Sequence, residues 1–188
     1  MEEHQKISRA SAKAKFAGGL ADHSELTIKG HTATHLLHQA LRDVLGDSVF
    51  QTGSNITSDR VRFDFSFDRK VTDEEIQKVE QIVKKKIAEN LPVHFEIMPL
   101  PRAKEIGAIG LFDEKYQDDV KVYFIGGPNP HPETLSHQGR GESNSDKPYS
   151  IEFCGGPHVN FTGEIKSFKI IKEESLGKNN RRIYAVVQ

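Results

Sequence analysis

Two different hydrophobic periods alternate along this chain, and this alternation restricts its fold more than any other feature. Over residues 30–46, apolar side chains follow the i, i+3, i+4, i+7 spacing of an amphipathic helix. Over residues 60–67, RVRFDFSF, they alternate strictly, which is typical of a half-buried strand. A second helix is predicted over residues 72–90, where Thr72 and Glu75 match a capping box.

The remaining elements are mostly strands, and they gather in the second half of the chain. A short helix is predicted over residues 102–112. Helices placed early and strands placed late predict an α+β fold, with a mainly antiparallel sheet packed against helices. The later predicted strands are 93–98, 120–125, 149–153, 167–174 and 181–187.

The 188 residues suffice for one domain with a hydrophobic core. We expect residues 1–29 to be a polar lead-in segment and residues 30–188 to form the domain. Within it, residues 126–148 are rich in Gly, Pro, Ser and Asn, which predicts a long exposed loop.

Composition and charge indicate the compartment in which the protein acts and the kinds of partner that it can bind. The formal net charge is −1, so any contact with RNA must come from a local basic patch. The single cysteine excludes an intramolecular disulfide, which favours an intracellular protein. The sequence contains no apolar run of the roughly 18 residues that a membrane span needs, and its start lacks a signal peptide. We therefore expect a cytoplasmic protein with no membrane partner.

Two pairs of potential metal ligands have the same spacing. His31 and His35 are four residues apart, on the side of the first helix opposite its apolar stripe. Cys154 and His158 are also four apart, in the turn-like sequence CGGPH. Three imidazoles and one thiolate would suit Zn²⁺.

Less specific interpretations exist for each of these residues. Histidines on a polar helix face are commonly solvated, and a lone cysteine is commonly a buried, inert thiol. Four protein ligands would close a structural site, whereas three would leave a position for water or substrate. The spacing leaves this open. His38 shares the face of His31 and His35 but has no counterpart among the ligands, so we expect it at a pocket rim or in solvent.

Five motifs in order resemble the editing domain of alanyl-tRNA synthetases. They are HTATHLLHQAL, FQTGSNI, RVRFDFSF, FCGGPHVNFTGEI and RRIYAVV, and the resemblance extends from about residue 16 to residue 188. Related domains occur in free-standing alanyl-tRNA editing proteins and in threonyl-tRNA synthetases. The fold implied is the second-additional-domain type of threonyl and alanyl-tRNA synthetases.

The resemblance implies zinc-dependent hydrolysis of tRNA(Ala) that carries serine or glycine, by a domain that forms part of an alanine–tRNA ligase. A pocket shaped for alanine excludes these two amino acids only weakly, so a second, hydrolytic site restores accuracy. The implied metal ligands are His31, His35, Cys154 and His158, with Cys154 central to catalysis. The implied pocket residues are Gln51, with a catalytic role, and Ser54, Gly155 and Gly156 near the substrate.

Contact with tRNA would need local positive charge. Lys178, Arg181 and Arg182 cluster near the C-terminal strand, and we expect them to contact RNA; for the two arginines the resemblance also implies this role. Lys84 to Lys86 are more typical of a solvated helix face. Two alternatives remain: a non-catalytic, zinc-stabilised tRNA-binding module, and a threonyl-type editing domain. The sequence also leaves open whether the chain is a fragment, with the rest of a synthetase as its partner, or a free-standing protein.

Overall fold

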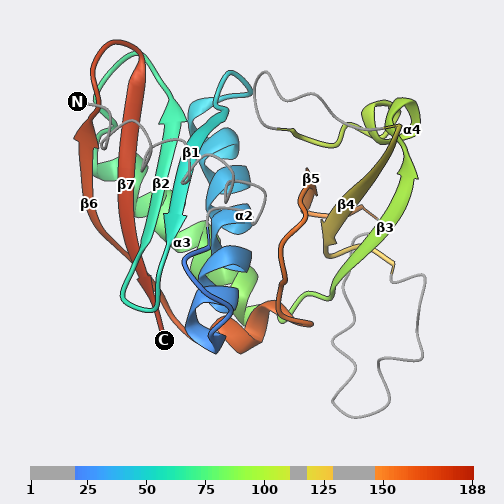
Figure 1. The fold of residues 1–188 in the computed structure, drawn as a ribbon. Coiled ribbons are helices and arrows are strands. Elements are labelled where there is room, and N and C mark those ends of the chain that lie inside the picture. Colours follow the sequence, from blue (N-terminus) through green and yellow to red (C-terminus); the bar gives the residue numbers. More distant parts are fainter. Residues whose placement is uncertain (1–19, 111–117, 129–146) are drawn as a thin grey trace, which may run out of the picture.

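Two antiparallel sheets lie on either side of one long helix, α2 (Figure 1). The computed structural model describes residues 20–110, 118–128 and 147–188. The predicted α+β class with antiparallel sheets is confirmed, although the strands divide between two sheets.

The larger sheet has four strands in the order β1-β2-β7-β6, and helices α2 and α3 cover one of its faces. The smaller sheet has the order β3-β4-β5. The elements are α2 (Glu25–Leu45), β1 (Gln51–Ile56), β2 (Val61–Ser66), α3 (Asp73–Ala88), β3 (Val93–Pro99), α4 (Leu100–Glu105), β4 (Asp119–Ile125), β5 (Ser150–Phe153), a 3-10 turn (Thr162–Ile165), β6 (Phe168–Ser175) and β7 (Asn180–Val187).

Helix α2 begins five residues before the predicted start at residue 30. The Ser24 side chain accepts a hydrogen bond from the backbone N–H of Thr27 and caps the helix. Gly46 ends it with a positive φ of 108°, which a residue with a side chain rarely adopts. The predicted capping box of α3 is also present, between Thr72 and Glu75.

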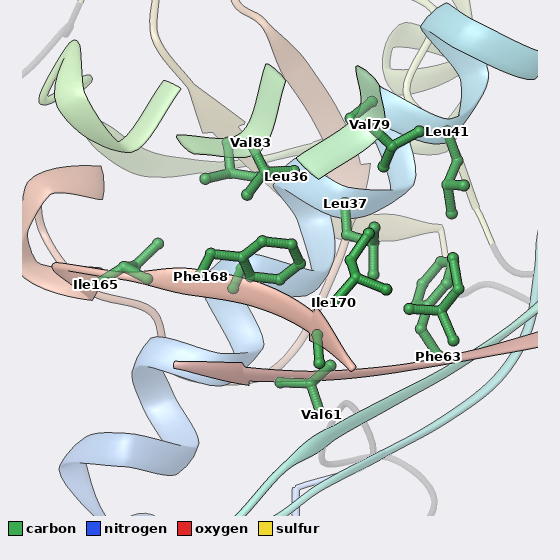
Figure 2. Packing of buried hydrophobic residues seen from close by; sticks show 14 of the residues in the cluster. Leu36, Leu37, Leu41, Val61, Phe63, Val79, Val83, Ile165, Phe168 and Ile170 are labelled. Atoms are coloured by element: carbon green, nitrogen blue, oxygen red, sulfur yellow. The ribbon is translucent and has the colours of Figure 1, made fainter. Parts of the chain in front are cut away.

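The main core fills the space between α2, α3 and the larger sheet (Figure 2). Leu36, Leu37 and Leu41 on α2 are fully buried, as are Phe63 and Phe65 on β2. This is the apolar stripe expected from the sequence, and it fixes α2 firmly against the sheet.

Glycine at position 30 allows the closest approach of α2 to the sheet. A Cβ added there would lie 2.9 Å from Cγ2 of Ile56 and 3.0 Å from Cγ2 of Val61. The helix backbone therefore packs directly on β1 and β2, one residue before the first candidate ligand, His31.

Strand β1 was not predicted, because its sequence QTGSNI is polar and contains a glycine. Its register is fixed by pairing with β2, and it is irregular between Gln51 and Gly53. An edge strand of this kind is stabilised by its neighbour rather than by its own hydrophobic pattern.

Parts of the predicted organisation fall on residues that the structure does not describe. Residues 1–19 of the lead-in and 129–146 of the predicted loop lie outside the described ranges, so the proposed division at residue 30 remains a prediction. The short helix α4 begins two residues before the predicted 102–112 segment and ends at Glu105. Among the described helices, none is both long and apolar enough to cross a membrane.

Candidate metal centre

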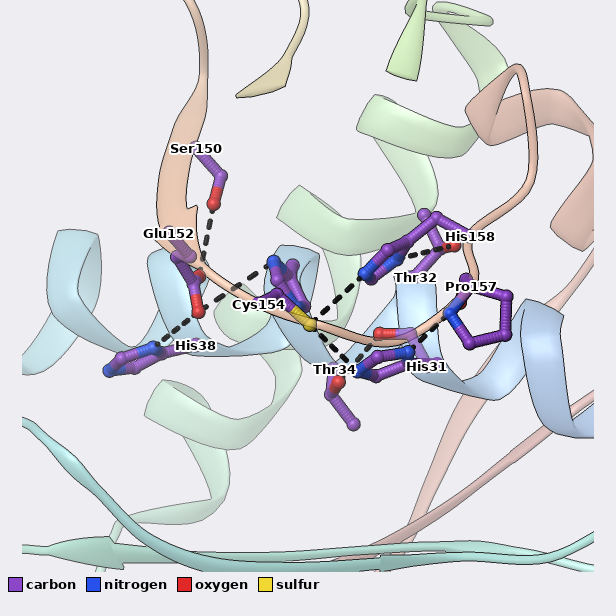
Figure 3. A network of polar contacts seen from close by, with 10 residues as sticks. His31, Thr32, Thr34, His38, Ser150, Glu152, Cys154, Pro157 and His158 are labelled. Carbon is purple, nitrogen blue, oxygen red and sulfur yellow. Dashed lines mark hydrogen bonds and ion pairs between the residues drawn. The ribbon is translucent and has the colours of Figure 1, made fainter. Parts of the chain in front are cut away.

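The two ligand pairs predicted from the sequence meet in space. His31 and His35 lie one turn apart on α2, and Cys154 and His158 lie on the turn that follows β5 (Figure 3). One ligand atom from each of the four residues lies within 4.8 Å of the others. The Cys154 Sγ is 3.3 Å from Nε2 of His31 and 3.4 Å from Nε2 of His158.

The partners of two histidine rings determine which ring nitrogen carries the proton. His31 Nδ1 lies 3.0 Å from the carbonyl oxygen of Pro157, which can only accept, so Nδ1 donates. His158 Nδ1 lies 3.1 Å from the hydroxyl oxygen of Thr32, which itself donates to the carbonyl of Ile28. In both rings Nε2 is left with a free lone pair that points at Cys154.

His35 has a different surrounding. Its Nδ1 faces the carboxylate of Glu152 on β5 at 3.7 Å, which is longer than a hydrogen bond. The same carboxylate oxygen accepts a hydrogen bond from Nδ1 of His38 at 3.3 Å, and the hydroxyl of Ser150 donates to the other oxygen at 3.0 Å. Glu152 is therefore the polar group against which His35 and His38 pack.

All three α2 histidines are buried, which corrects the expectation for His38. Its exposed fraction is 2%, and those of His31 and His35 are 2% and 5%. The side of α2 that is polar in sequence is covered by β5 and by the turn over residues 154–158, here called the ligand turn, so His38 lies neither at a rim nor in solvent. A residue can thus be polar and still face the interior when another polar element covers it.

Burial tunes the protonation of the four ligands. It lowers the pKa of His31 to about 3, and it also lowers the pKa values of His35 and His158 below their usual range. Burial raises the pKa of the Cys154 thiol to about 12, although a backbone hydrogen bond from Gly156 opposes this. At neutral pH the imidazoles are therefore neutral, as ligands must be, and the thiol would lose its proton to a bound cation.

These observations fit a zinc ion. Neutral imidazoles and a thiolate are its preferred ligands, and tetrahedral zinc separates sulfur from nitrogen by roughly 3.5 Å. Two of the Sγ–Nε2 distances, 3.3 and 3.4 Å, are close to this value. The donor set and these two distances are therefore consistent with the metal that the sequence indicates.

The second glycine of the turn has a steric role. A Cβ added to Gly156 would lie 2.3 Å from Cε1 and 2.8 Å from Nδ1 of His31, closer than atoms can approach. Only glycine lets the turn lie against this ring. The sequence implied that Gly156 is near the substrate, and the structure adds that it contacts a ligand.

One wall of the centre comes from the smaller sheet. The Tyr123 ring lies 4.1 Å from that of His158, centroid to centroid, and the His158 ring also stacks on that of His31 at 4.1 Å. The Lys121 ammonium lies over the Tyr123 ring at 4.7 Å. Tyr123 and Lys121 therefore border the ligands on β4.

The other predicted pocket residues lie apart from this group. Gln51 and Ser54 are half-buried on β1, in the larger sheet, on the far side of α2 from β5. Gly155 is exposed on the ligand turn. The structure thus brings together the four ligands and Gly156, and leaves Gln51 and Ser54 in a different element.

The predicted RNA-contacting residues lie on the β6–β7 hairpin. Lys178 is exposed in its turn. Arg181 binds the carboxylate of Glu173 at 2.5 Å, and Arg182 binds both carboxylate oxygens of Asp64 at 2.6 and 2.8 Å. Both arginines therefore already have carboxylate partners within the sheet.

Sequence reasoning missed Glu152, Thr32 and the burial of His38. The signal for Glu152 was its position two residues before Cys154, on a strand whose alternation turns Ser150 and Glu152 to the same side. Thr32 gave no signal, since a threonine within a helix is common.

Comparison with known proteins agrees with the family resemblance seen in the sequence. The threonyl and alanyl tRNA synthetase second additional domain matches residues 120–184, which include all but the first residue of β4, and β5 and the ligand turn. The alanine–tRNA ligase of Treponema denticola is 50% identical over 187 residues, covering all of this chain and 28% of that protein. That of Borreliella burgdorferi is 48% identical over 186 residues, with 99% and 28% covered.

A more distant bacterial relative agrees. The alanine–tRNA ligase of Bacillus subtilis is 47% identical over 159 residues, which cover 85% of this chain and 16% of that protein. The chain therefore spans less than a third of the length of the curated relatives that it matches.

Proposed function

The chain belongs to the threonyl and alanyl tRNA synthetase second additional domain family, within the alanine–tRNA ligases, and we propose that it hydrolyses tRNA(Ala) wrongly charged with serine or glycine. The convergence of His31, His35, Cys154 and His158 within 4.8 Å is the observation that carries this proposal. In the cell the domain works in the cytoplasm, with the rest of the ligase and mischarged tRNA as its partners.

The reaction is hydrolysis of an ester. The oxygen of water bonds to the carbonyl carbon of the aminoacyl group, the bond from that carbon to the terminal ribose oxygen breaks, and the ribose oxygen takes up a proton. The products are a free amino acid and uncharged tRNA. A zinc ion held by the four ligands would act as a Lewis acid that polarises the ester or orients the water.

The chain's own residues prepare this site. Thr32 and Pro157 hold the rings of His158 and His31 with Nε2 directed at the centre. Gln51, Ser54, Gly155 and Gly156 remain our proposal for residues that contact the aminoacyl group. Gly155 and Gly156 are the better supported of these, because they lie on the ligand turn itself.

A deacylation assay tests the proposal. We expect the protein to release serine from seryl-tRNA(Ala) and glycine from glycyl-tRNA(Ala), and to lose this activity with a zinc chelator. Cys154→Ala should reduce the rate at least about 100-fold, because it removes a ligand. Ser58→Ala, at an exposed turn, is the matched control. Full deacylation by a folded Cys154→Ala protein would refute the zinc-dependent mechanism.

The assay also separates the alternatives. If all four residues bound the ion at once, the site would be closed, as in a non-catalytic, zinc-stabilised tRNA-binding module. That module would bind zinc and tRNA without turnover. A threonyl-type editing domain would act on seryl-tRNA for threonine and leave seryl-tRNA(Ala) intact.

We further propose that Lys178, Arg181 and Arg182 contact tRNA phosphates. Removing each true contact should weaken binding and reduce the slope of log affinity against log salt by roughly 1. Lys178→Ala is the cleanest variant, since Lys178 is exposed, and Lys85→Ala, on the outer face of α3, is its control. An unchanged slope in Lys178→Ala and in the Arg181→Ala, Arg182→Ala double variant would remove these residues from the interface.

A further inference from the structure

The buried carboxylate of Glu152 has no role in the function proposed above. It is 6% exposed, on β5, two residues before Cys154. A carboxylate is rarely buried without charged or hydrogen-bonding partners, because it gives up its hydration. Its nearest polar partners are Ser150 on the same strand and two histidines of α2, His35 and His38 (Figure 3).

Two of these partners fix the direction of the carboxylate. The hydroxyl of Ser150 donates to Oε1 at 3.0 Å, and Nδ1 of His38 donates to Oε2 at 3.3 Å. Ser150 and His38 are themselves nearly inaccessible, with exposed fractions of 1% and 2%. Oε2 is thereby held against α2, where it also faces Nδ1 of His35 at 3.7 Å.

Among the three histidines of the ligand group, His35 is the one whose outer nitrogen lacks a hydrogen bond within the described residues. Nδ1 of His31 has the Pro157 carbonyl and Nδ1 of His158 has the Thr32 hydroxyl. Nδ1 of His35 is buried and forms none, and Oε2 of Glu152 is the acceptor that faces it. A histidine ligand generally donates its second N–H to a carboxylate, carbonyl or water, which sets its tautomer and ring orientation.

We infer that Glu152 is a positioning residue, which holds the proton of His35 on Nδ1 and thereby presents Nε2 to the metal. His38 and Ser150 keep the Glu152 carboxylate aimed at this ring. The inference rests on the proposed metal centre but adds a residue that does not itself bind the ion.

Zinc affinity of the intact chain is the test, and it requires no catalytic readout. The metal-free protein competes with a chromophoric chelator for Zn²⁺, and the dissociation constant is compared with that of Glu152→Gln. Substitution of such an outer carboxylate typically weakens metal binding 10- to 100-fold, and we expect a loss of about this size. Glu105→Gln, an exposed glutamate on α4, serves as the control and should bind as the unchanged protein does.

A second readout reports the ring itself. In ¹⁵N spectra of the zinc-free protein, His35 should carry its proton on Nδ1, and in Glu152→Gln this preference should weaken. Thermal unfolding of the zinc-free proteins checks folding. A purely structural role for Glu152 would lower the melting temperature but leave both the dissociation constant and the tautomer unchanged, and that result would overturn the inference.

The outcomes also separate this inference from the proposed function. If the unchanged protein binds no zinc, the metal centre itself is refuted. If the unchanged protein and Glu152→Gln bind zinc equally well, only the positioning role of Glu152 is refuted. Should Glu152→Gln fail to fold, Glu152→Asp replaces it, with the charge kept and the side chain one methylene shorter. We expect weaker zinc binding there too, and equal binding would overturn the inference.

Discussion

Two buried polar clusters join distant segments of this chain. They differ in whether the protein itself supplies a partner for every polar group. In the first, the ligand cluster, His31, His35, Cys154 and His158 bring α2 and the β5 turn together. In the second, on the larger sheet, Arg182 of β7 binds both carboxylate oxygens of Asp64 on β2. The Asp64 carboxylate has its opposite charge in place, whereas the ligand cluster directs neutral nitrogen lone pairs and a thiol at one point.

This difference distinguishes a structural cluster from a binding site. An ion pair with both hydrogen bonds formed is complete within the protein and needs no bound cation. Converging lone pairs that share a single thiol proton are all satisfied only when a cation joins them. Changes in the ligand cluster should therefore alter metal binding, and changes in the Asp64 pair should alter stability.

The largest expected effect is at the glycine that contacts His31. Gly156→Ala forces the ring away, because the new Cβ would lie 2.3 Å from its Cε1. We expect zinc affinity to fall by roughly 100-fold or more, since a misplaced ligand contributes little. Chelator competition measures this, with the exposed neighbour Gly155→Ala as control. Equal affinity in the two variants would mean that His31 is not a ligand.

The Asp64 pair should respond in the opposite way. Asp64→Asn removes the charge that Arg182 binds, and we expect a loss of about 2 kcal/mol in the free energy of unfolding, below the cost of breaking a fully buried pair. Zinc affinity should stay the same. Urea unfolding measures the loss, with the exposed Asp59→Asn as control. A change in zinc affinity would contradict the separation of the clusters.

Acid should destabilise the zinc-free protein through the ligand cluster. The pKa of His31 is about 3 in the folded chain and near 6.5 when unfolded, so between these values the unfolded state binds more protons. The free energy of unfolding should thus fall as pH falls from about 6.5 towards 3, by at most about 1.4 kcal/mol per pH unit at this histidine. His31→Gln should flatten the slope of unfolding free energy against pH, and an unchanged slope would contradict the assignment.

An exposed ion pair provides the smallest effect. Glu75 caps α3 and binds Arg69, which together lower its pKa to about 2. Its stabilisation is present above pH 4.5 and is lost as pH falls towards 2. Glu75→Gln should cost no more than about 1 kcal/mol at pH 7, as is usual for exposed pairs, and should remove this acid dependence. Urea unfolding measures the loss of unfolding free energy. A loss larger than about 1 kcal/mol would contradict the assignment of this ion pair as an exposed, weakly stabilising one.

Elements with strong local patterns were predictable from the sequence, whereas elements that depend on neighbours were not. The alternation in β2 and the capping box of α3 appear as expected, because both are set by residues a few positions apart. Strand β1 depends on pairing with β2, and the division into two sheets depends on contacts between distant strands. Neither leaves a local signal.

The candidate site shows the same limit. Spacing within each ligand pair reflects one turn of helix or one tight turn, so both pairs were visible. That they meet, that His38 is buried and that Glu152 faces His35 all depend on β5 covering α2. The hydrophobic periodicity of the α2 sequence does not indicate which element packs over the polar side of the helix.

His31 and Cys154 are 123 positions apart in the sequence, and this separation affects the order in which the site can form during synthesis. The ribosome releases α2 early, with two imidazoles but no sulfur, and a histidine pair alone holds zinc weakly. The thiol and the last imidazole follow only after α2, α3, α4 and strands β1 to β5 have been made. Tight zinc capture therefore requires that the nascent chain has passed the turn after β5, and shorter chains should bind the metal only weakly.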